Sequence, residues 1–165
     1  MTDTMYAPLC AKTEEGEKKK ILFVCTGNTC RSPMAEALFR YLFPDSEYEP
    51  ASRGLSANSS PISEYAVTAL MERGVLPVPG KDYRRHVSKT VTEEDMAGAD
   101  LVVGITSSHA MRLIAAYPAY ASKICVMPED ISDPYGGSLE DYRQCLKNIE
   151  DGLTAAFGKD APCRE

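Results

Sequence analysis

Hydrophobic and polar positions along the chain divide it into two kinds of segment. Short apolar runs rich in branched side chains predict strands, and longer stretches with an apolar stripe at helical spacing predict helices. The expected strands are Ile21–Val24, Tyr48–Arg53, Leu101–Ile105 and Lys123–Met127. The expected helices are Met34–Leu42, Pro61–Glu72, Thr92–Ala97, Ser108–Ala116 and Leu139–Phe157, the last of them loosely broken at Gly152.

Strands that alternate with helices favour an open, mostly parallel sheet covered by helices on both faces. The pattern therefore predicts an α/β protein with a single three-layer αβα domain over residues 20–158. Residues 1–19 carry little apolar periodicity and are expected to form an irregular arm, and residues 159–165 a short tail. In such sheets, ligands bind beyond the carboxyl ends of the strands.

Composition narrows the classes of protein that fit this domain. The net charge is −6, which argues against affinity for nucleic-acid phosphates, and no apolar run reaches the roughly 18 to 20 residues of a membrane span. Six irregularly spaced cysteines do not suggest a disulfide scaffold, so we expect a reducing, cytoplasmic setting. With two histidines and no Cys-x-x-Cys, a structural metal site is not expected, and no nucleotide-binding glycine motif is present.

The most informative segment lies between the first expected strand and the helix that follows it. There Cys25 and Arg31 are separated by five residues, which include Gly27 and Asn28. A loop with residues that tolerate positive φ turns its N–H groups inward, and together with a helix N-terminus it forms an anion site. Arg31 adds a planar fork of donors that suits two oxygens of a phosphate.

Cys25, at the base of such a ring, would feel the same positive potential and be a thiolate at neutral pH. Ser32 could donate a hydrogen bond to that sulfur. The sequence also predicts that Ser32 caps the following helix, with Pro33 in its first turn. A thiolate beneath a bound phosphoryl group is placed for in-line attack. The competing interpretation is that Cys25 is a buried core cysteine at the end of a strand.

Such attack requires a proton donor for the leaving group, and the loop after the fourth expected strand offers carboxyl groups. We favour Asp133, because Pro134 fixes the chain after it and Tyr135 would help to form a partly dry mouth that keeps the carboxyl protonated. The same group would then serve as general base on water. Glu129 and Asp130 are the substitutes, and plain turn chemistry is the competing interpretation of Asp133-Pro134.

Together, the segment from Cys25 to Pro33 and the later Asp133-Pro134 resemble the low-molecular-weight protein tyrosine phosphatase family, over about Lys20 to Phe157. The resemblance implies a four-stranded parallel sheet in flavodoxin-like order, phosphocysteine chemistry, no metal and no cofactor. It implies that Cys25 is the nucleophile, Arg31 the phosphate clamp and Asp133 the acid and base. It further implies that the loop and its surroundings contact the substrate, through Thr26, Gly27, Asn28, Thr29, Cys30 and Tyr135. It also implies that Asn28, Ser32 and His86 have supporting roles, with His86 bracing Asn28.

Within this family, Thr29 and the stretch Asp133 to Ser138 are similar to the bacterial protein arginine phosphatase branch. The Thr29 hydroxyl can orient water or a polar group at a phosphoramidate, and the acids Glu129, Asp130 and Asp133 would attract a guanidinium. A phosphorylated protein with phosphoarginine is thus the preferred substrate. Phosphotyrosine is the alternative, since Tyr135 could stack on its ring.

Cys30 matches a cysteine that in this family can form a reversible disulfide with the nucleophile, and a filler thiol beneath the loop is the competing interpretation. An arsenate reductase would need a further cysteine pair in the middle of the chain, where none occurs. A non-catalytic phosphoprotein-binding module would need neither Cys25 nor Asp133. His109 follows hydroxyl residues that are expected to cap a helix. The oligomeric state stays open, with a monomer expected.

Overall fold

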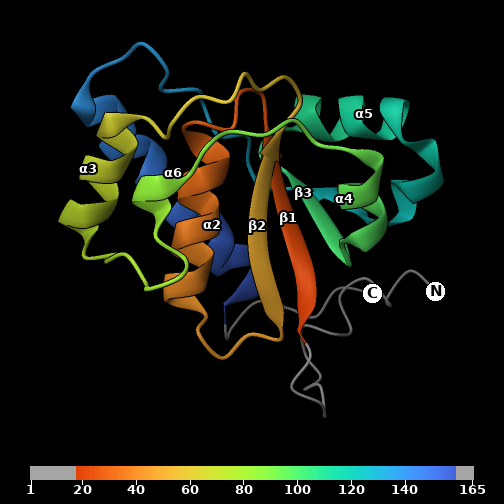
Figure 1. Ribbon diagram of the computed structural model, residues 1–165, viewed down its shortest axis with the longest axis horizontal. Coiled ribbons are helices and arrows are strands. Elements are labelled where there is room, and N and C mark those ends of the chain that lie inside the picture. The colour runs from red at the N-terminus through yellow and green to blue at the C-terminus, as the bar shows by residue number, and fades with distance from the viewer. Residues whose placement is uncertain (1–17, 159–165) are drawn as a thin grey trace.

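The computed structural model describes residues 18–158, and a four-stranded parallel sheet forms its centre (Figure 1). The strands lie in the order β2-β1-β3-β4, which confirms the expected sheet. In the register, Ile21 lies opposite Pro50 on one side and Leu101 on the other. The bounds are β1 (Lys19–Cys25), β2 (Tyr48–Gly54), β3 (Leu101–Gly104) and β4 (Ile124–Val126).

Helices cover both faces of this sheet, as the alternating pattern predicted (Figure 1). One layer holds α2 (Arg31–Leu42), α3 (Glu64–Arg73) and α6 (Leu139–Phe157), and the other holds α4 (Glu93–Gly98) and α5 (Ser107–Ala116). Two short 3₁₀ segments, η2 (Tyr83–Arg85) and η3 (Pro118–Lys123), complete the elements. The expected arm falls almost wholly outside the described residues, and the expected tail lies wholly outside them.

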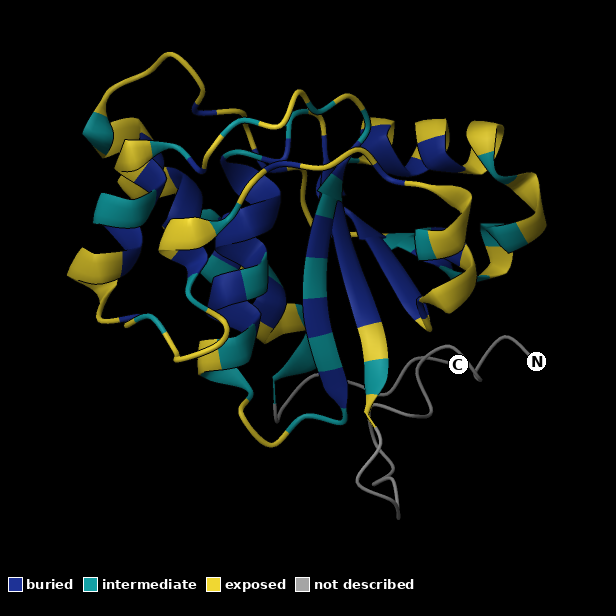
Figure 2. Cartoon of the chain, in the orientation of Figure 1, coloured by how far each residue is buried: buried dark blue, intermediate teal, exposed yellow. Residues whose placement is uncertain are grey.

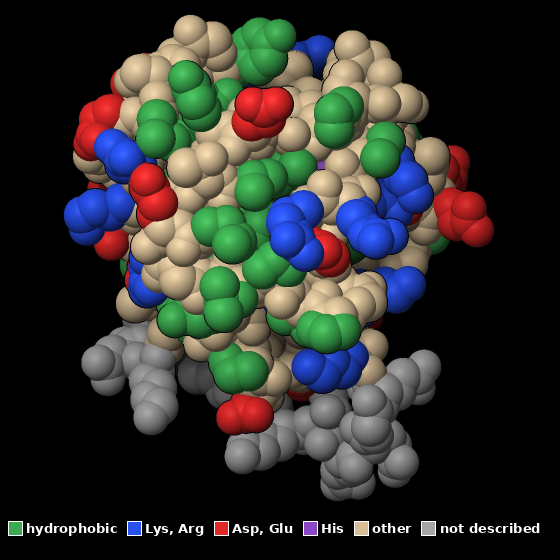
Figure 3. Space-filling view, turned by 60° about the vertical axis from the view of Figure 1, so that its left-hand side comes forward, with side chains coloured by type: hydrophobic (Ala, Val, Ile, Leu, Met, Phe, Trp, Pro, Cys, Tyr) green, Lys and Arg blue, Asp and Glu red, His purple; other side chains and the backbone are tan. Residues whose placement is uncertain are grey.

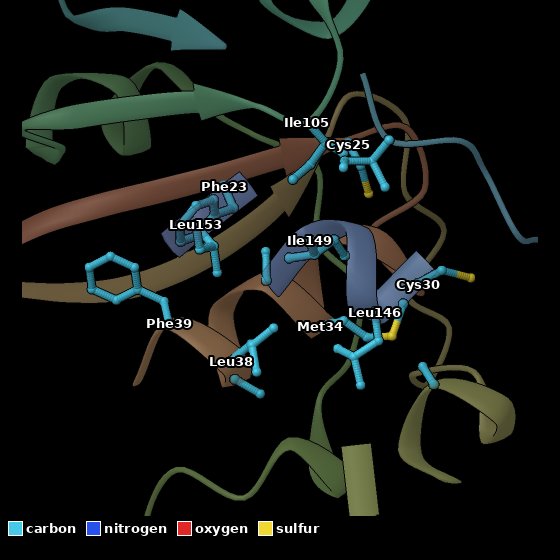
Figure 4. Close-up of a cluster of buried hydrophobic side chains, with 14 of the residues drawn as sticks. Phe23, Cys25, Cys30, Met34, Leu38, Phe39, Ile105, Leu146, Ile149 and Leu153 are labelled. Carbon is cyan, nitrogen blue, oxygen red and sulfur yellow. The ribbon is translucent and has the colours of Figure 1, made fainter. Parts of the chain in front are cut away.

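The core is divided by β1, whose residues from Ile21 to Cys25 are buried on both faces (Figure 2). Phe23 packs into the cluster beneath α2 and α6, which Figure 4 shows, whereas Leu22 and Val24 pack toward α4 and α5. Burying each of these side chains contributes about 1.5–3 kcal/mol to the stability of the fold. Cys25 lies at the edge of the first cluster, so the sequence that builds the core also anchors the loop that follows β1.

Three expectations about the helices are wrong, and the first concerns the start of α2, which lies at Arg31 rather than Met34. Helix α3 begins at Glu64 rather than Pro61, because Pro61 pairs with Val87 in an isolated bridge and Ser63 is the extended residue before the helix. Helix α6 continues through Gly152 without the expected break. A Cβ at Gly152 would lie 2.6 Å from the Met127 methyl group, so this glycine makes room for packing rather than ending the helix.

The helix N-termini differ in how their free N–H groups are satisfied. Thr92, Thr106 and Ser138 each cap their helix in a reciprocal capping box, which confirms the caps expected at Thr92 and before His109. In α2, the residue at the cap position is Cys30, with no side-chain cap bond and no acidic residue in the first turn. The prediction that Ser32 caps this helix is therefore wrong. The N–H groups at the positive end of α2 have no side-chain cap and can bind an anion.

Charged side chains on the surface are mixed in sign. Figure 3 shows Lys and Arg beside Asp and Glu on the face turned forward, and ion pairs such as Arg73–Glu150 and Arg143–Glu72 join α3 to α6. Exposed pairs of this kind contribute little to stability, at most about 1 kcal/mol each. Among the described residues, no helix combines the length and the apolar character that crossing a membrane requires.

Candidate active site

A cavity of about 650 Å³ opens at the carboxyl end of β1. The loop from Cys25 to Cys30, called the phosphate loop below, forms its floor between β1 and α2. Arg31, Asp133 and Tyr135 line the cavity, as do residues of the 56–64 segment. The structure therefore brings together the two distant parts of the chain that the sequence singled out, the first loop and the loop after β4.

Cys25 is 2% exposed, and its sulfur is held by polar groups rather than by the core alone. The Ser32 hydroxyl oxygen lies 3.0 Å from Cys25 Sγ, and the Asn28 backbone N–H donates to the sulfur at 3.3 Å. Hydrogen bonds to a sulfur stabilise its anionic form. The surroundings are those of a polar site at the end of a buried strand, not those of a thiol packed only among apolar side chains.

Asn28 has a φ of 61°, in the left-handed region that asparagine tolerates better than most residues. Its side chain is fully buried and donates to Ser32 Oγ at 2.8 Å and to Ser52 Oγ at 3.1 Å, while its oxygen accepts the Lys89 N–H at 3.0 Å. His86 Nε2 donates to the Asn28 carbonyl oxygen at 2.8 Å. The contact between His86 and Asn28 that the resemblance implied is thus present.

Gly27, the glycine that the sequence singled out, is not the one that fits closely against its neighbours. Gly27 has no positive φ, and a Cβ there would meet only Thr29 Oγ1 at 3.9 Å, so the expected turn chemistry rests on Asn28 alone. Gly54, at the end of β2, was missed. A Cβ at Gly54 would lie 2.7 Å from the Thr26 carbonyl oxygen and 3.0 Å from Asn28 Cβ. The phosphate loop therefore lies directly against the backbone of β2.

Arg31 is 6% exposed and joins the phosphate loop to the loop after β4. One terminal nitrogen donates to the Ile131 carbonyl oxygen at 2.9 Å, and the other lies 3.5 Å from Asp133 Oδ2. A guanidinium held in this way keeps its planar fork at the cavity wall. It is placed to neutralise a bound oxyanion.

Asp133 uses its two carboxylate oxygens differently. Oδ1 accepts the Tyr135 N–H at 3.1 Å, which is turn chemistry, whereas Oδ2 faces Arg31. The partly dry mouth that we expected is not present, because the Asp133 side chain is 52% exposed and Tyr135 is 77% exposed. Asp133 is therefore both a turn residue and a carboxyl group at the cavity.

Thr29 and Cys30 occupy the far side of the loop. Thr29 lines the cavity, and its hydroxyl lies 3.6 Å from Cys30 Sγ. Cys30 is buried, with its sulfur 3.3 Å from the Tyr142 hydroxyl, and burial raises the pKa of this thiol. Burial likewise raises the pKa of Tyr142 to about 12. Both groups are therefore neutral at physiological pH.

Comparison with known proteins agrees with this geometry. A family model described as low molecular weight phosphotyrosine protein phosphatase matches residues 20–160. The chain belongs to this family. It is 36% identical over 143 residues to a protein-arginine-phosphatase of Bacillus subtilis, covering 81% of this chain and 91% of that protein. It is 35% identical over 137 residues to the low molecular weight protein-tyrosine-phosphatase PtpB of Staphylococcus haemolyticus, covering 79% and 91%.

Among solved structures, the chain matches a cysteine-to-serine mutant of the YwlE arginine phosphatase with a phosphorylated active-site serine. The TM-score is 0.73 at 34% identity, over 86% of this chain and 97% of that one. This phosphatase therefore shares its fold with YwlE. In that mutant, the serine that replaces the active-site cysteine of YwlE carries a phosphate.

In this low-molecular-weight phosphatase, the three acids expected beside the substrate do not lie together. Asp133 lines the cavity, but Asp130 accepts bonds from the backbone and hydroxyl of Ser107 at 2.8 and 3.1 Å, and Glu129 is absent from the cavity lining. Asp130 is thus held at the start of α5. Glu64, at the start of α3, lines the cavity instead and was not among the predicted site residues.

Two further polar residues contact the phosphate loop, and neither contact was predicted from the sequence. Ser52 accepts from Asn28 and donates to Glu36 Oε1 at 2.9 Å, although it reads as an ordinary strand residue. His109 is 4% exposed, with Nε2 2.9 Å from Thr26 Oγ1. Nothing in the local sequence indicates either contact. Within residues 18–158, no group of three or more His, Cys, Asp or Glu is placed to hold a metal ion.

Proposed function

We propose that this phosphatase hydrolyses phosphoarginine in proteins through a phosphocysteine formed on Cys25. The observation that carries the proposal is the position of Cys25 Sγ, hydrogen-bonded to the phosphate loop and to Ser32 at the floor of a cavity that Arg31 and Asp133 also line. The cavity joins a nucleophile, an anion site and a carboxyl group, which together are what phosphoryl transfer through a covalent intermediate requires.

In the first step, the Cys25 thiolate attacks phosphorus and the bond from phosphorus to the substrate nitrogen breaks. Asp133 gives its proton to the departing guanidine nitrogen. The loop N–H groups, the uncapped start of α2 and Arg31 bind the phosphoryl oxygens, where negative charge gathers in the transition state. Ser32 donates to the sulfur before attack and again when the sulfur departs.

In the second step, water replaces the guanidine. The Asp133 carboxylate takes a proton from this water, the water oxygen attacks phosphorus, and the bond from sulfur to phosphorus breaks. Inorganic phosphate and the Cys25 thiolate are the products, so no electrons are exchanged and no co-reactant is required.

Arginine is the preferred substrate side chain for two reasons. Thr29 places a hydroxyl on the cavity wall where it can orient a polar nitrogen or water, and Glu64 places a carboxylate on the same wall, near a bound guanidinium. The relative of Bacillus subtilis named protein-arginine-phosphatase supports the same substrate.

Phosphotyrosine is the second candidate, and Tyr135 favours it. This side chain lines the cavity and is 77% exposed, so it can stack on a phenyl ring. The relative of Staphylococcus haemolyticus is named a protein-tyrosine-phosphatase.

The two substrates are separated by measuring kcat/KM on matched phosphoarginine and phosphotyrosine peptides. We expect the wild type to prefer phosphoarginine and Thr29→Ile to lose about tenfold of that preference, the value of one neutral hydrogen bond. A wild-type preference for phosphotyrosine that Thr29→Ile leaves unchanged would refute the arginine assignment.

The chemical roles are tested separately from the substrate. Cys25→Ser should abolish turnover while retaining binding of inorganic phosphate. Asp133→Ala should slow hydrolysis about 10² to 10⁴ fold for poor leaving groups and less for p-nitrophenyl phosphate. Glu129→Ala is the matched control, because Glu129 lies on the same loop without lining the cavity. If Asp133→Ala has unaltered rates, the acid lies elsewhere.

We also propose that the enzyme acts in the cytoplasm as a monomer. The four cysteines within residues 18–158 are free thiols, which suits a reducing compartment and a thiolate nucleophile. Light scattering of the purified protein checks the oligomeric state, and a mass near 36 kDa, about twice the 18.0 kDa of the chain, would contradict a monomer.

A further inference from the structure

His109 connects the start of α5 to the phosphate loop, 83 residues earlier in the chain. The Thr106 backbone N–H donates to His109 Nδ1 at 3.1 Å, so Nδ1 carries no hydrogen. The neutral ring must then carry its hydrogen on Nε2, which lies 2.9 Å from Thr26 Oγ1. His109 is therefore the donor and Thr26 the acceptor in this contact.

The ring remains neutral in this position. Burial, followed by the positive charges of Arg31 and Arg112, lowers the pKa of His109 to about 4, against a smaller opposite effect of Asp133 and Asp130. At neutral pH, the direction of the bond to Thr26 is therefore fixed.

A helix cap alone does not account for a histidine at this position. The other two capping boxes of the described chain use Asp95 and Asp141 at the third helical position, and both side chains reach back to the cap N–H. His109 performs the same cap with Nδ1 and has a second nitrogen that extends to the phosphate loop. The second contact is what an aspartate would lack.

Thr26 follows Cys25 directly and lines the same cavity. Its hydroxyl oxygen accepts from His109, so its own hydrogen must point toward a different acceptor. Among the described residues, the Thr26 hydroxyl has no second hydrogen-bond partner. That hydrogen is therefore available to an oxygen of a group bound in the cavity.

We infer that His109 is a positioning residue that holds the Thr26 hydroxyl as a donor to the bound phosphoryl group. The inference rests on the proposed function, and it adds a side-chain donor to the backbone N–H groups of the phosphate loop. Without His109, the hydroxyl of Thr26 is free to rotate and to donate its hydrogen bond to water instead of to the phosphoryl group.

Three variants and a conservative replacement, Thr26→Ser, test this arrangement. Thr26→Val removes the hydroxyl at nearly constant shape, His109→Asn keeps a side chain able to cap α5 but too short to reach Thr26, and the double variant combines them. Each single variant should lower kcat/KM about 10- to 100-fold, as expected for a hydrogen bond to a charged group. The double variant should lose no more than Thr26→Val alone, and Thr26→Ser should recover part of the loss.

Ser108→Ala is the matched control, since Ser108 is exposed beside His109 on α5, and its activity should equal that of the wild type. Urea unfolding of every variant shows whether α5 is intact. Losses that multiply in the double variant, or an unchanged kcat/KM in His109→Asn, would overturn the inference while Cys25-dependent turnover still stands.

Two readouts are independent of turnover. The chain has two histidines, so ¹⁵N spectra of the wild type and His109→Asn assign both rings. We expect the Nε2–H tautomer for His109, and an Nδ1–H tautomer would overturn the inference. Affinity for inorganic vanadate should fall in Thr26→Val and His109→Asn. If the wild type lacked phosphatase activity, the proposed function would fail, but these two measurements would still decide the role of His109.

Discussion

Gly54 offers a direct test of how closely the fold supports the phosphate loop. In Gly54→Ala, the new Cβ would lie 2.7 Å from the Thr26 carbonyl oxygen, whereas ordinary contact begins at 3.4 Å, so relief requires a shift of about 0.7 Å. The backbone of Gly54 cannot retreat easily. Its N–H donates to the Lys89 carbonyl and its carbonyl accepts the Val91 N–H, both at 2.8 Å.

The loop must therefore move instead of β2. A misplacement of 1 Å in an active site costs about 100-fold in rate, so a shift of most of that distance should lower kcat/KM by roughly 10- to 100-fold. Overpacking should cost about 1–3 kcal/mol of unfolding free energy, offset by about 0.4–1 kcal/mol from the less flexible unfolded chain. The net loss of unfolding free energy should thus be at most about 2.6 kcal/mol, which a domain of ordinary stability survives, so kcat/KM should fall while the protein stays folded.

The assay is kcat/KM on a phosphopeptide beside the urea midpoint of the same preparation. Gly152→Ala is the matched control, because its Cβ would lie 2.6 Å from the Met127 methyl group, the movable end of a flexible side chain. Its activity should equal that of the wild type. If Gly54→Ala kept kcat/KM within twofold of the wild type, contact with β2 would not set the geometry of the loop.

Three other properties can be predicted from the described contacts. Because the folded-state pKa of His109 is about 4 against an ordinary 6.5, the unfolded chain binds more protons between these two pH values. His109 should therefore lower the unfolding free energy by about 3 kcal/mol between pH 7 and pH 4. Urea titrations at each pH check this, and an equal fall in His109→Asn would contradict it. After oxidation, a dithiol should restore the wild type more fully than Cys30→Ser, and equal recovery would remove Cys30 from redox protection. Phe39→Ala should cost about 3–5 kcal/mol in urea unfolding, because Phe39 is 1% exposed and contacts three phenylalanine rings; a loss below 1 kcal/mol would refute this packing.

The elements that were predicted well are those whose signal is local. The buried run before Cys25 and the helical stripe after Pro33 each encode their own type, and their alternation leads to the parallel sheet. Boundaries were less well predicted, because they depend on partners elsewhere. Pro61 pairs with Val87 instead of entering α3, and Gly152 fits against Met127 instead of ending α6.

The site divides in the same way. The spacing of Cys25 and Arg31 lies within one loop, so it could be read from the sequence, and Asp133 was predicted from its neighbours Pro134 and Tyr135 as well as from the resemblance. Ser52 and His109 reach the loop only through the order of strands in the sheet, which places the ends of β2 and β3 on either side of β1. The exposure of Tyr135 likewise depends on the path of a loop, and the sequence carries no local signal for it.

Asn28 shows why these remote contacts matter for the proposed chemistry. A left-handed backbone at a residue other than glycine is sparsely populated, and it persists only when surrounding groups hold it. Here the holding groups are Ser32, Ser52, His86 and the backbone of Lys89, which come from three segments: α2, β2 and the stretch 86–89. The donors of the loop are therefore oriented before any substrate binds, and the cost of ordering them is met during folding rather than during the reaction. The same reasoning explains why a phosphate site can exist in a chain of net charge −6: its positive potential is made locally, by oriented N–H groups and one buried guanidinium, and not by the charge of the protein as a whole.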